Sequence, residues 1–145
     1  MEEENMYILA MSRTKKDIKY YLQDRADKVY VHICKILLYP NSPYVDHWKH
    51  EIYAFISSMH KLKNTNKFPS KEFVETVLLE DLDNMIDVFI NQAIADEDNS
   101  NFVDISNERA EQTCKQYAEW LAEHLASDGF VTNREVKEIL GKICK

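Results

Sequence analysis

Three side chains that can coordinate a metal lie close together in the segment HWKHE. His47, His50 and Glu51 are spaced i, i+3 and i+4, so on a helix they share one face and could hold a zinc or iron ion. A metal site inside a helical bundle needs ligands that point inward. The apolar residues of this segment repeat on nearly the opposite face, so we interpret the trio as solvent-exposed and keep metal binding as the alternative.

The segment DEDNSNFVDISNE has oxygen-bearing side chains at the spacing of a calcium loop. The first, third, fifth and ninth ligand positions hold Asp96, Asp98, Ser100 and Asp104. The sixth position is Asn101 instead of glycine, and the twelfth is Asn107 instead of a bidentate glutamate. We therefore interpret the segment as a solvated acidic loop, with a weak divalent-cation site as the alternative.

The segment SDGFVTNREVKEIL also resembles the second half of a calcium loop, because a glutamate follows its glycine by six residues. With Gly129 at the sixth position, the first and third positions are His124 and Ala126, so two oxygen ligands are missing. We interpret it as a turn between helices. Gly129 would end one helix, and Thr132 with Glu135 would form a capping box that starts the next.

Few other residues offer chemistry. The chain has only two glycines, whereas phosphate-binding loops and nucleophile elbows need several, so those motifs are excluded. The three cysteines lack the spacing of metal ligands. Cys34 and Cys114 lie on or beside apolar stripes and are predicted to be buried thiols rather than nucleophiles. We expect no catalytic residues and no cofactor.

Helices must position all of these residues, because no strand-like alternation of useful length occurs. Helices are predicted over residues 14–38, 43–61 (capped by Ser42), 71–95 (capped by Ser70, kinked or split near Glu80), 107–127 (capped by Ser106) and 133–143. The first has a stripe of Ile18, Leu22, Ala26, Val29, Ile33 and Leu37. The predicted class is all-α: residues 1–145 form one domain, a bundle of four main helices plus a short C-terminal helix, with a flexible segment over residues 1–12.

Charge is distributed unevenly along the chain, whose net charge is −7. Residues 13–71 contain twelve basic and five acidic residues, whereas residues 72–111 contain twelve acidic residues and one basic residue. One interpretation is that the two parts neutralise each other inside the fold. The other is an exposed acidic surface that meets a basic partner.

These observations lead to a functional hypothesis. We expect a small soluble protein-interaction module without catalysis, acting as a regulator, inhibitor or adaptor through an acidic helical surface. The predicted contact residues are Glu80, Asp83, Asp87, Asp96, Asp98 and Asp104. The alternative is a metal-binding helical-bundle protein or enzyme that uses the 96–104 loop or the His47, His50 and Glu51 trio.

Other partners and locations are less consistent with the composition. Lysines alternate with tyrosines in KKDIKYY, but Asp17, Asp24 and Asp27 are interspersed, so nucleic-acid binding through residues 13–71 is not expected. No segment approaches the roughly 20 apolar residues that span a membrane. The odd number of cysteines and the absence of a secretory signal indicate a cytoplasmic protein.

Overall fold

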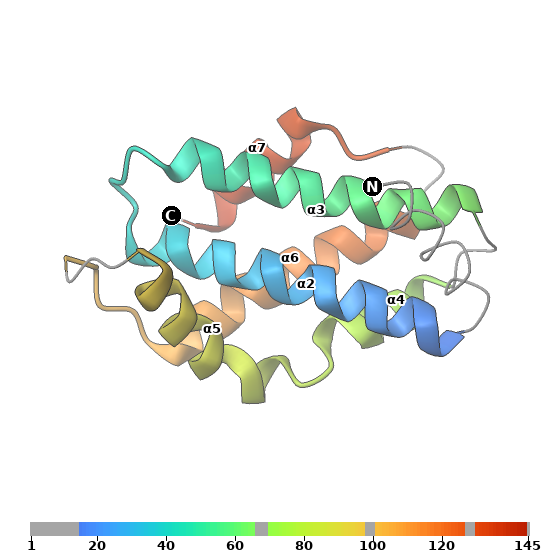
Figure 1. Cartoon of the computed structure of the whole chain (residues 1–145), viewed down its shortest axis with the longest axis horizontal. Helices are drawn as coiled ribbons and strands as arrows, with labels where there is room; N and C mark the ends of the chain where they lie inside the picture. The colour runs from blue at the N-terminus through green and yellow to red at the C-terminus, as the bar shows by residue number, and fades with distance from the viewer. Residues whose placement is uncertain (1–14, 66–69, 98–100, 127–129, 145) are drawn as a thin grey trace.

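The computed structural model describes residues 15–65, 70–97, 101–126 and 130–144 (Figure 1). Its helices are α2 (Lys15–Leu38), α3 (Val45–Thr65), α4 (Lys71–Leu79), α5 (Leu82–Glu97), α6 (Asn107–Ala126) and α7 (Asn133–Ile143). No strand occurs in these ranges, which confirms the predicted all-α class. The predicted flexible segment 1–12 lies outside the described residues.

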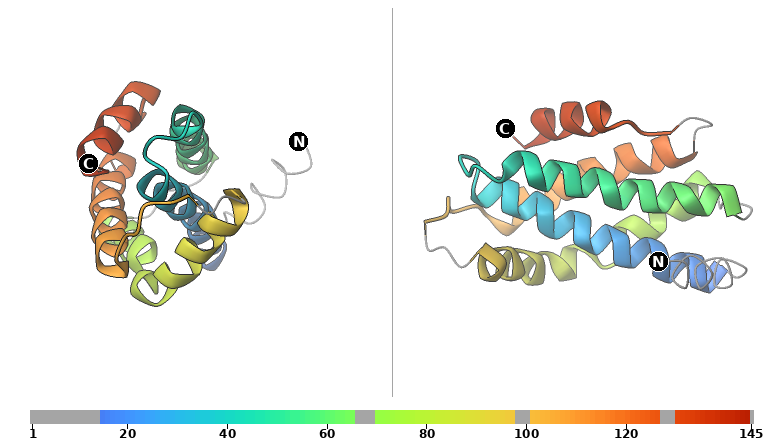
Figure 2. Two further views of the ribbon diagram at one scale, coloured as in Figure 1. Left: turned by 90° about the vertical axis from the view of Figure 1, so that its left-hand side faces the viewer. Right: turned by 45° about the horizontal axis from the view of Figure 1, so that its top comes forward.

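Helix α2 lies at the centre, with the other helices arranged around it (Figure 2). It packs against α3, α4, α5 and α6, while α7 packs against α3 and α6. Every residue of the predicted α2 stripe is buried, but so is every residue from Val29 to Leu38. The prediction of one apolar stripe was therefore too narrow, because contact with four helices also buries the other faces of α2.

The predicted third helix is divided into α4 and α5. The backbone of Asp81 has a positive φ of 61°, which no α-helix accommodates, and Glu80 forms the C-cap of α4. Helical hydrogen bonding resumes when the amide of Met85 donates to the carbonyl of Asp81 at 2.9 Å. The break lies where the sequence indicated it, and it makes six described helices instead of the predicted four main helices plus a short one.

Serine and threonine side chains begin several helices as predicted. Ser70 Oγ accepts a hydrogen bond from the Phe73 amide at 3.2 Å, and Ser106 Oγ accepts one from the Arg109 amide at 3.1 Å. Thr132 and Glu135 form the predicted capping box of α7. The second predicted helix is present, but its ends differ: α3 starts at Val45, because the prolines keep the preceding residues in a turn, and it continues to Thr65.

Apolar side chains from all six helices form one buried cluster. Among its largest fully buried members are Leu22, Ile52, Leu78, Ile86 and Tyr117. None of the described helices is long and apolar enough to cross a lipid bilayer.

Candidate interaction surface

Helix α5 turns one face toward the core and one toward solvent. Leu82, Ile86, Phe89, Ile90 and Ala93 are buried, since α5 packs against α2 and α6. Asp83 and Asp87 lie on the opposite, exposed face. Val88, which is 49% exposed, lies beside them. The chain changes direction at the break at Asp81, so α5 does not continue the line of α4 (Figure 1).

Two of the predicted contact residues form ion pairs with the basic part of the chain. The carboxylate of Glu80 lies 3.1 Å from Lys19 Nζ and accepts a hydrogen bond from Gln23 at 3.0 Å. Asp96 lies 3.4 Å from Lys35 Nζ. The interpretation that the basic and acidic parts neutralise each other therefore holds for these two residues, which link α2 to the α4–α5 break and to the end of α5.

Asp83 and Asp87 differ from Glu80 and Asp96 in their partners. Within the described ranges, neither forms an ion pair with a cationic side chain. Asp83 accepts a hydrogen bond from the amide of Asn84 at 3.0 Å, and Asp87 accepts one from Asn91 at 3.5 Å. Because the two carboxylates are one helical turn apart and both exposed, their negative charge faces solvent.

The two remaining predicted contact residues belong to the segment between α5 and α6. Asp98 lies outside the described residues. Asp104 is exposed, in an extended stretch that crosses the C-terminus of α2. The amide of Val103 fixes this crossing by donating to the carbonyl of Leu38 at 2.8 Å. The structure therefore places Asp104 at the same end of α5 as Asp96, separate from Asp83 and Asp87 near its start.

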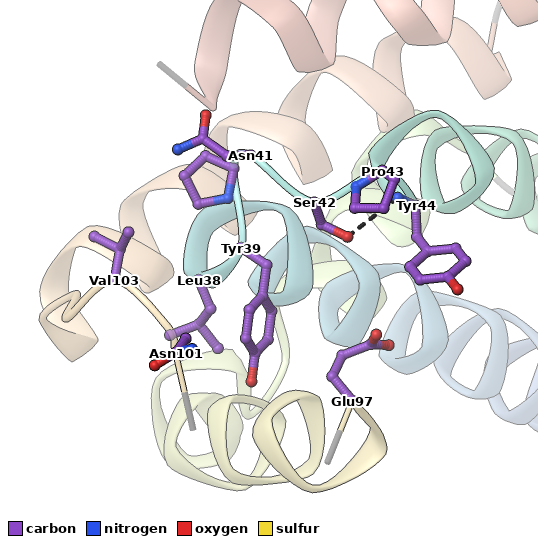
Figure 3. A pocket seen from close by; sticks show the side chains of 10 residues that line it. Leu38, Tyr39, Asn41, Ser42, Pro43, Tyr44, Glu97, Asn101 and Val103 are labelled. Atoms are coloured by element: carbon purple, nitrogen blue, oxygen red, sulfur yellow. Dashed lines mark hydrogen bonds between the residues drawn. The ribbon is translucent and has the colours of Figure 1, made fainter. Parts of the chain in front are cut away.

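A hollow of about 380 Å³ lies where α2 and α5 end and α3 begins (Figure 3). Pro40 and Pro43 stop the chain from continuing as a helix, and Ser42 Oγ accepts a hydrogen bond from the Tyr44 amide at 3.1 Å. Among the described residues the lining is mostly apolar, with Leu38, Tyr39, Pro40, Pro43, Tyr44 and Val103, and the charged residue is Glu97. Its volume lies at the lower end of the range for ligand pockets.

Two other aromatic rings hold Tyr39 in position in this hollow. Its ring centroid lies 6.3 Å from those of both Trp48 and Phe102. Desolvation, followed by the charge of Glu97, raises the pKa of Tyr39 above its ordinary value, so its hydroxyl stays protonated. Phe102 and Tyr44 are partly exposed near the hollow, with exposed fractions of 37% and 59%. Exposed aromatic residues of this kind are enriched at protein interfaces.

Of the three residues considered as alternative metal ligands, His47 and Glu51 are bonded to each other. Glu51 accepts a hydrogen bond from His47 at 2.7 Å and another from His32 of α2, a residue that no local sequence pattern indicates. The ring of His50 packs against Tyr53, with centroids 6.2 Å apart. In the described part of the chain, no group of three histidine, cysteine or acidic residues could hold a metal ion.

The acidic segment with calcium-loop spacing, predicted to be a solvated loop, is only partly described. Its first ligand position, Asp96, is still helical and is paired with Lys35, whereas Asp98 and Ser100 lie outside the described residues. In the other calcium-like segment, Gly129 is also outside the described residues. The Thr132 and Glu135 interaction there needs no metal, and bonds from the Thr132 amide and hydroxyl lower the pKa of Glu135.

Histidine 60 shows another role that the sequence did not indicate. His60 is buried, and its Nε2 accepts a hydrogen bond from the Val131 amide at 3.0 Å. This bond attaches the segment before α7 to α3. Because Nε2 is the acceptor, Nδ1 must carry the proton, and the ring is neutral.

The three cysteines lie near one another, with Cys34 and Cys114 buried and Cys144 partly exposed. Cys34 and Cys114 are fully buried and free of disulfides, as predicted. Burial, together with a hydrogen bond to Cys34, raises the pKa of Cys114 well above its ordinary value. Burial also raises the pKa of Cys144 to about 11. Thiolates are the nucleophilic form, so neither Cys114 nor Cys144 is activated.

Comparisons with known proteins add no functional information: no family model, no curated protein and no solved structure matches this chain.

The hollow could have been anticipated from the sequence only in part. The segment YPNSPY indicates a turn with exposed rings, but nothing local indicates that Glu97 and Val103 come to lie beside it.

Proposed function

We propose that this chain is a non-catalytic protein-interaction module that binds a basic partner protein through the exposed face of α5. It would act as a regulator, inhibitor or adaptor. The observation that carries the proposal is the contrast among its carboxylates. Glu80 and Asp96 pair with lysines of α2, whereas Asp83 and Asp87 are exposed without a cationic partner among the described residues.

Repulsion between the two carboxylates favours a basic partner on this face. Two like charges one turn apart destabilise a helix by about 0.2–0.5 kcal/mol, and a cationic group placed between them would reverse that cost. Such a surface also raises the association rate of a basic protein by electrostatic steering. Asp104, together with the exposed part of the Asp96 side chain, would extend the contact at the other end of α5.

A cytoplasmic location is part of the proposal. It is supported by the three thiols, which are free in the structure and typical of a reducing compartment.

A matched pair of charge reversals tests the proposal. Asp83→Lys with Asp87→Lys changes the α5 face, and Glu119→Lys with Glu123→Lys makes the same change on exposed positions of α6. Proteins captured from the native cells are quantified by mass spectrometry, and the main candidate is then titrated against each purified variant. We expect a basic partner that binds the wild type and the α6 variant, with an affinity that falls as salt rises.

The result that contradicts the proposal is equally specific. If the α5 and α6 variants bind the partner with the same affinity as the wild type, the exposed face of α5 is not the contact. If both variants lose binding equally, overall charge rather than this face controls the interaction.

A further inference from the structure

The hollow at the end of α5 combines aromatic walls with one carboxylate, an arrangement suited to a cation. Tyr39 and Tyr44 come from the turn after α2, and the side chain of Glu97 extends from the end of α5 toward that turn (Figure 3). Aromatic faces attract cations through their negative π-electron density, and a carboxylate adds a directed charge. We propose that this hollow receives an arginine side chain of the basic partner, an inference that rests on the proposed function.

The local charge is negative even after internal pairing. Lys35 Nζ lies 3.4 Å from a carboxylate oxygen of Asp96 and 3.4 Å from one of Glu97. One cation therefore serves two anions, and one negative charge remains uncompensated. The Lys35 side chain is only 11% exposed, so its charge is directed at these carboxylates and not at the solvent.

The ends of the helices add to the negative electrostatic potential of the hollow. Both α2 and α5 end at the hollow, and the C-terminus of a helix carries partial negative charge. The N-terminus of α3, which begins there as well, offsets one of the two. The acidic Asp46 in the first turn of α3 further limits that positive contribution.

Arginine fits these groups better than lysine. Its guanidinium is planar, stacks on aromatic rings and can donate two parallel hydrogen bonds to one carboxylate. It is also more weakly hydrated than an ammonium group, so entering a hollow lined by Leu38, Pro40 and Val103 costs less desolvation.

Small probes test the hollow without the partner. Nα-acetyl-arginine amide and its neutral analogue Nα-acetyl-citrulline amide are titrated into the full chain, and backbone amide shifts are followed by NMR. We expect the arginine probe to shift the amides of Asn41, Ser42, Tyr44 and Val103. The citrulline probe, which keeps the shape but lacks the charge, should bind about fivefold or more weakly.

Two variants assign the effect to named groups. Glu97→Gln should weaken the arginine probe about threefold to fivefold, and Asp96 remains to pair with Lys35. Tyr44→Ala should weaken it about twofold to fivefold, and since Tyr44 is largely exposed the fold should be unaffected. Glu119→Gln on α6 is the control and should leave the affinity unchanged. Thermal melting of each variant confirms that it is folded.

Several results would overturn the inference. Equal binding of the citrulline probe would show that the hollow does not recognise charge. An unchanged affinity in Glu97→Gln, or shifts located on other helices, would place the cation elsewhere. Tighter binding of Nα-acetyl-lysine amide would contradict the assignment to arginine.

The same experiments separate this inference from the proposed function. Asp83→Lys with Asp87→Lys should abolish partner binding and leave probe binding at the hollow within about twofold, because these residues are near the other end of α5. If the probes fail while partner binding still depends on Asp83 and Asp87, the hollow is not the arginine site and the α5 face stands alone.

Discussion

His32 of α2 donates a hydrogen bond from Nε2 to the carboxylate of Glu51 on α3. Its other ring nitrogen, Nδ1, lies 2.7 Å from the carbonyl oxygen of Lys28, so both nitrogens face acceptors. The bond joins the two longest of the described helices.

The Glu51 interaction predicts a specific acid sensitivity. Partial burial opposes ionisation, but the hydrogen bond from His32 and the charges of His32, His47 and Lys35 hold the pKa of Glu51 below its ordinary value of 4.5. Its stabilising contribution is complete above that value and is lost as the pH falls through the lowered pKa. Glu51→Gln should cost about 0.5–1 kcal/mol near pH 7 and flatten the acid dependence.

Urea denaturation at several pH values measures this effect, with Glu119→Gln as the exposed-carboxylate control. A variant that loses stability in parallel with the wild type below pH 4.5 would show that Glu51 does not carry the acid dependence.

Two buried tyrosines should respond oppositely to removal of the hydroxyl. Tyr30 donates to the carbonyl of Leu78, which the last turn of α4 leaves without a helical partner, so Tyr30→Phe should destabilise by about 1–2 kcal/mol. The Tyr117 hydroxyl is fully buried and has no hydrogen-bond partner among the described residues. Tyr117→Phe should therefore be neutral or stabilising by up to about 1 kcal/mol. Equal destabilisation of both variants in chemical denaturation would contradict this difference.

The break between α4 and α5 should accept glycine. Asp81 has a φ of 61° and is exposed, so Asp81→Gly removes backbone strain without removing a buried contact. We expect a gain of about 0.5–1 kcal/mol in the free energy of unfolding, whereas Asp81→Val should lose more than that. A loss of stability in the glycine variant would mean that the Asp81 side chain itself supports the break.

The thiols should be protected in the folded protein. Near pH 7, brief treatment with iodoacetamide should leave Cys34 and Cys114 unmodified, because both are fully buried. Cys144 should react slowly, because its pKa is about 11. In guanidinium chloride all three should react, which intact-mass spectrometry would show as three adducts. Rapid labelling of a single cysteine in the folded state would indicate an activated thiol.

Local sequence features predicted the helices because each one depends on neighbouring residues. Ser70, Ser106 and the Thr132–Glu135 pair start helices through bonds that span only three residues. The interruption near Glu80 was also visible in the pattern, although the positive φ that causes it belongs to Asp81.

Interactions between distant segments were not predictable in the same way. His32 and Lys35 lie in an apolar stretch of α2, and only the structure shows that Glu51, Asp96 and Glu97 reach them. The acidic residues looked alike in the sequence, but packing of α2 against α5 separates those with a lysine partner from Asp83 and Asp87. The sequence gives the net charge of each segment, whereas the ion pairs depend on which helices pack against each other.

The central position of α2 has a consequence for how the protein is made. During translation α2 leaves the ribosome before any of the helices α3 to α6 that cover it. The apolar residues around α2 therefore remain exposed to water until α6 has been synthesised, because α3, α4 and α5 alone do not enclose the helix. Nascent chains that stall before α6 should therefore aggregate and bind chaperones more readily than the folded protein does.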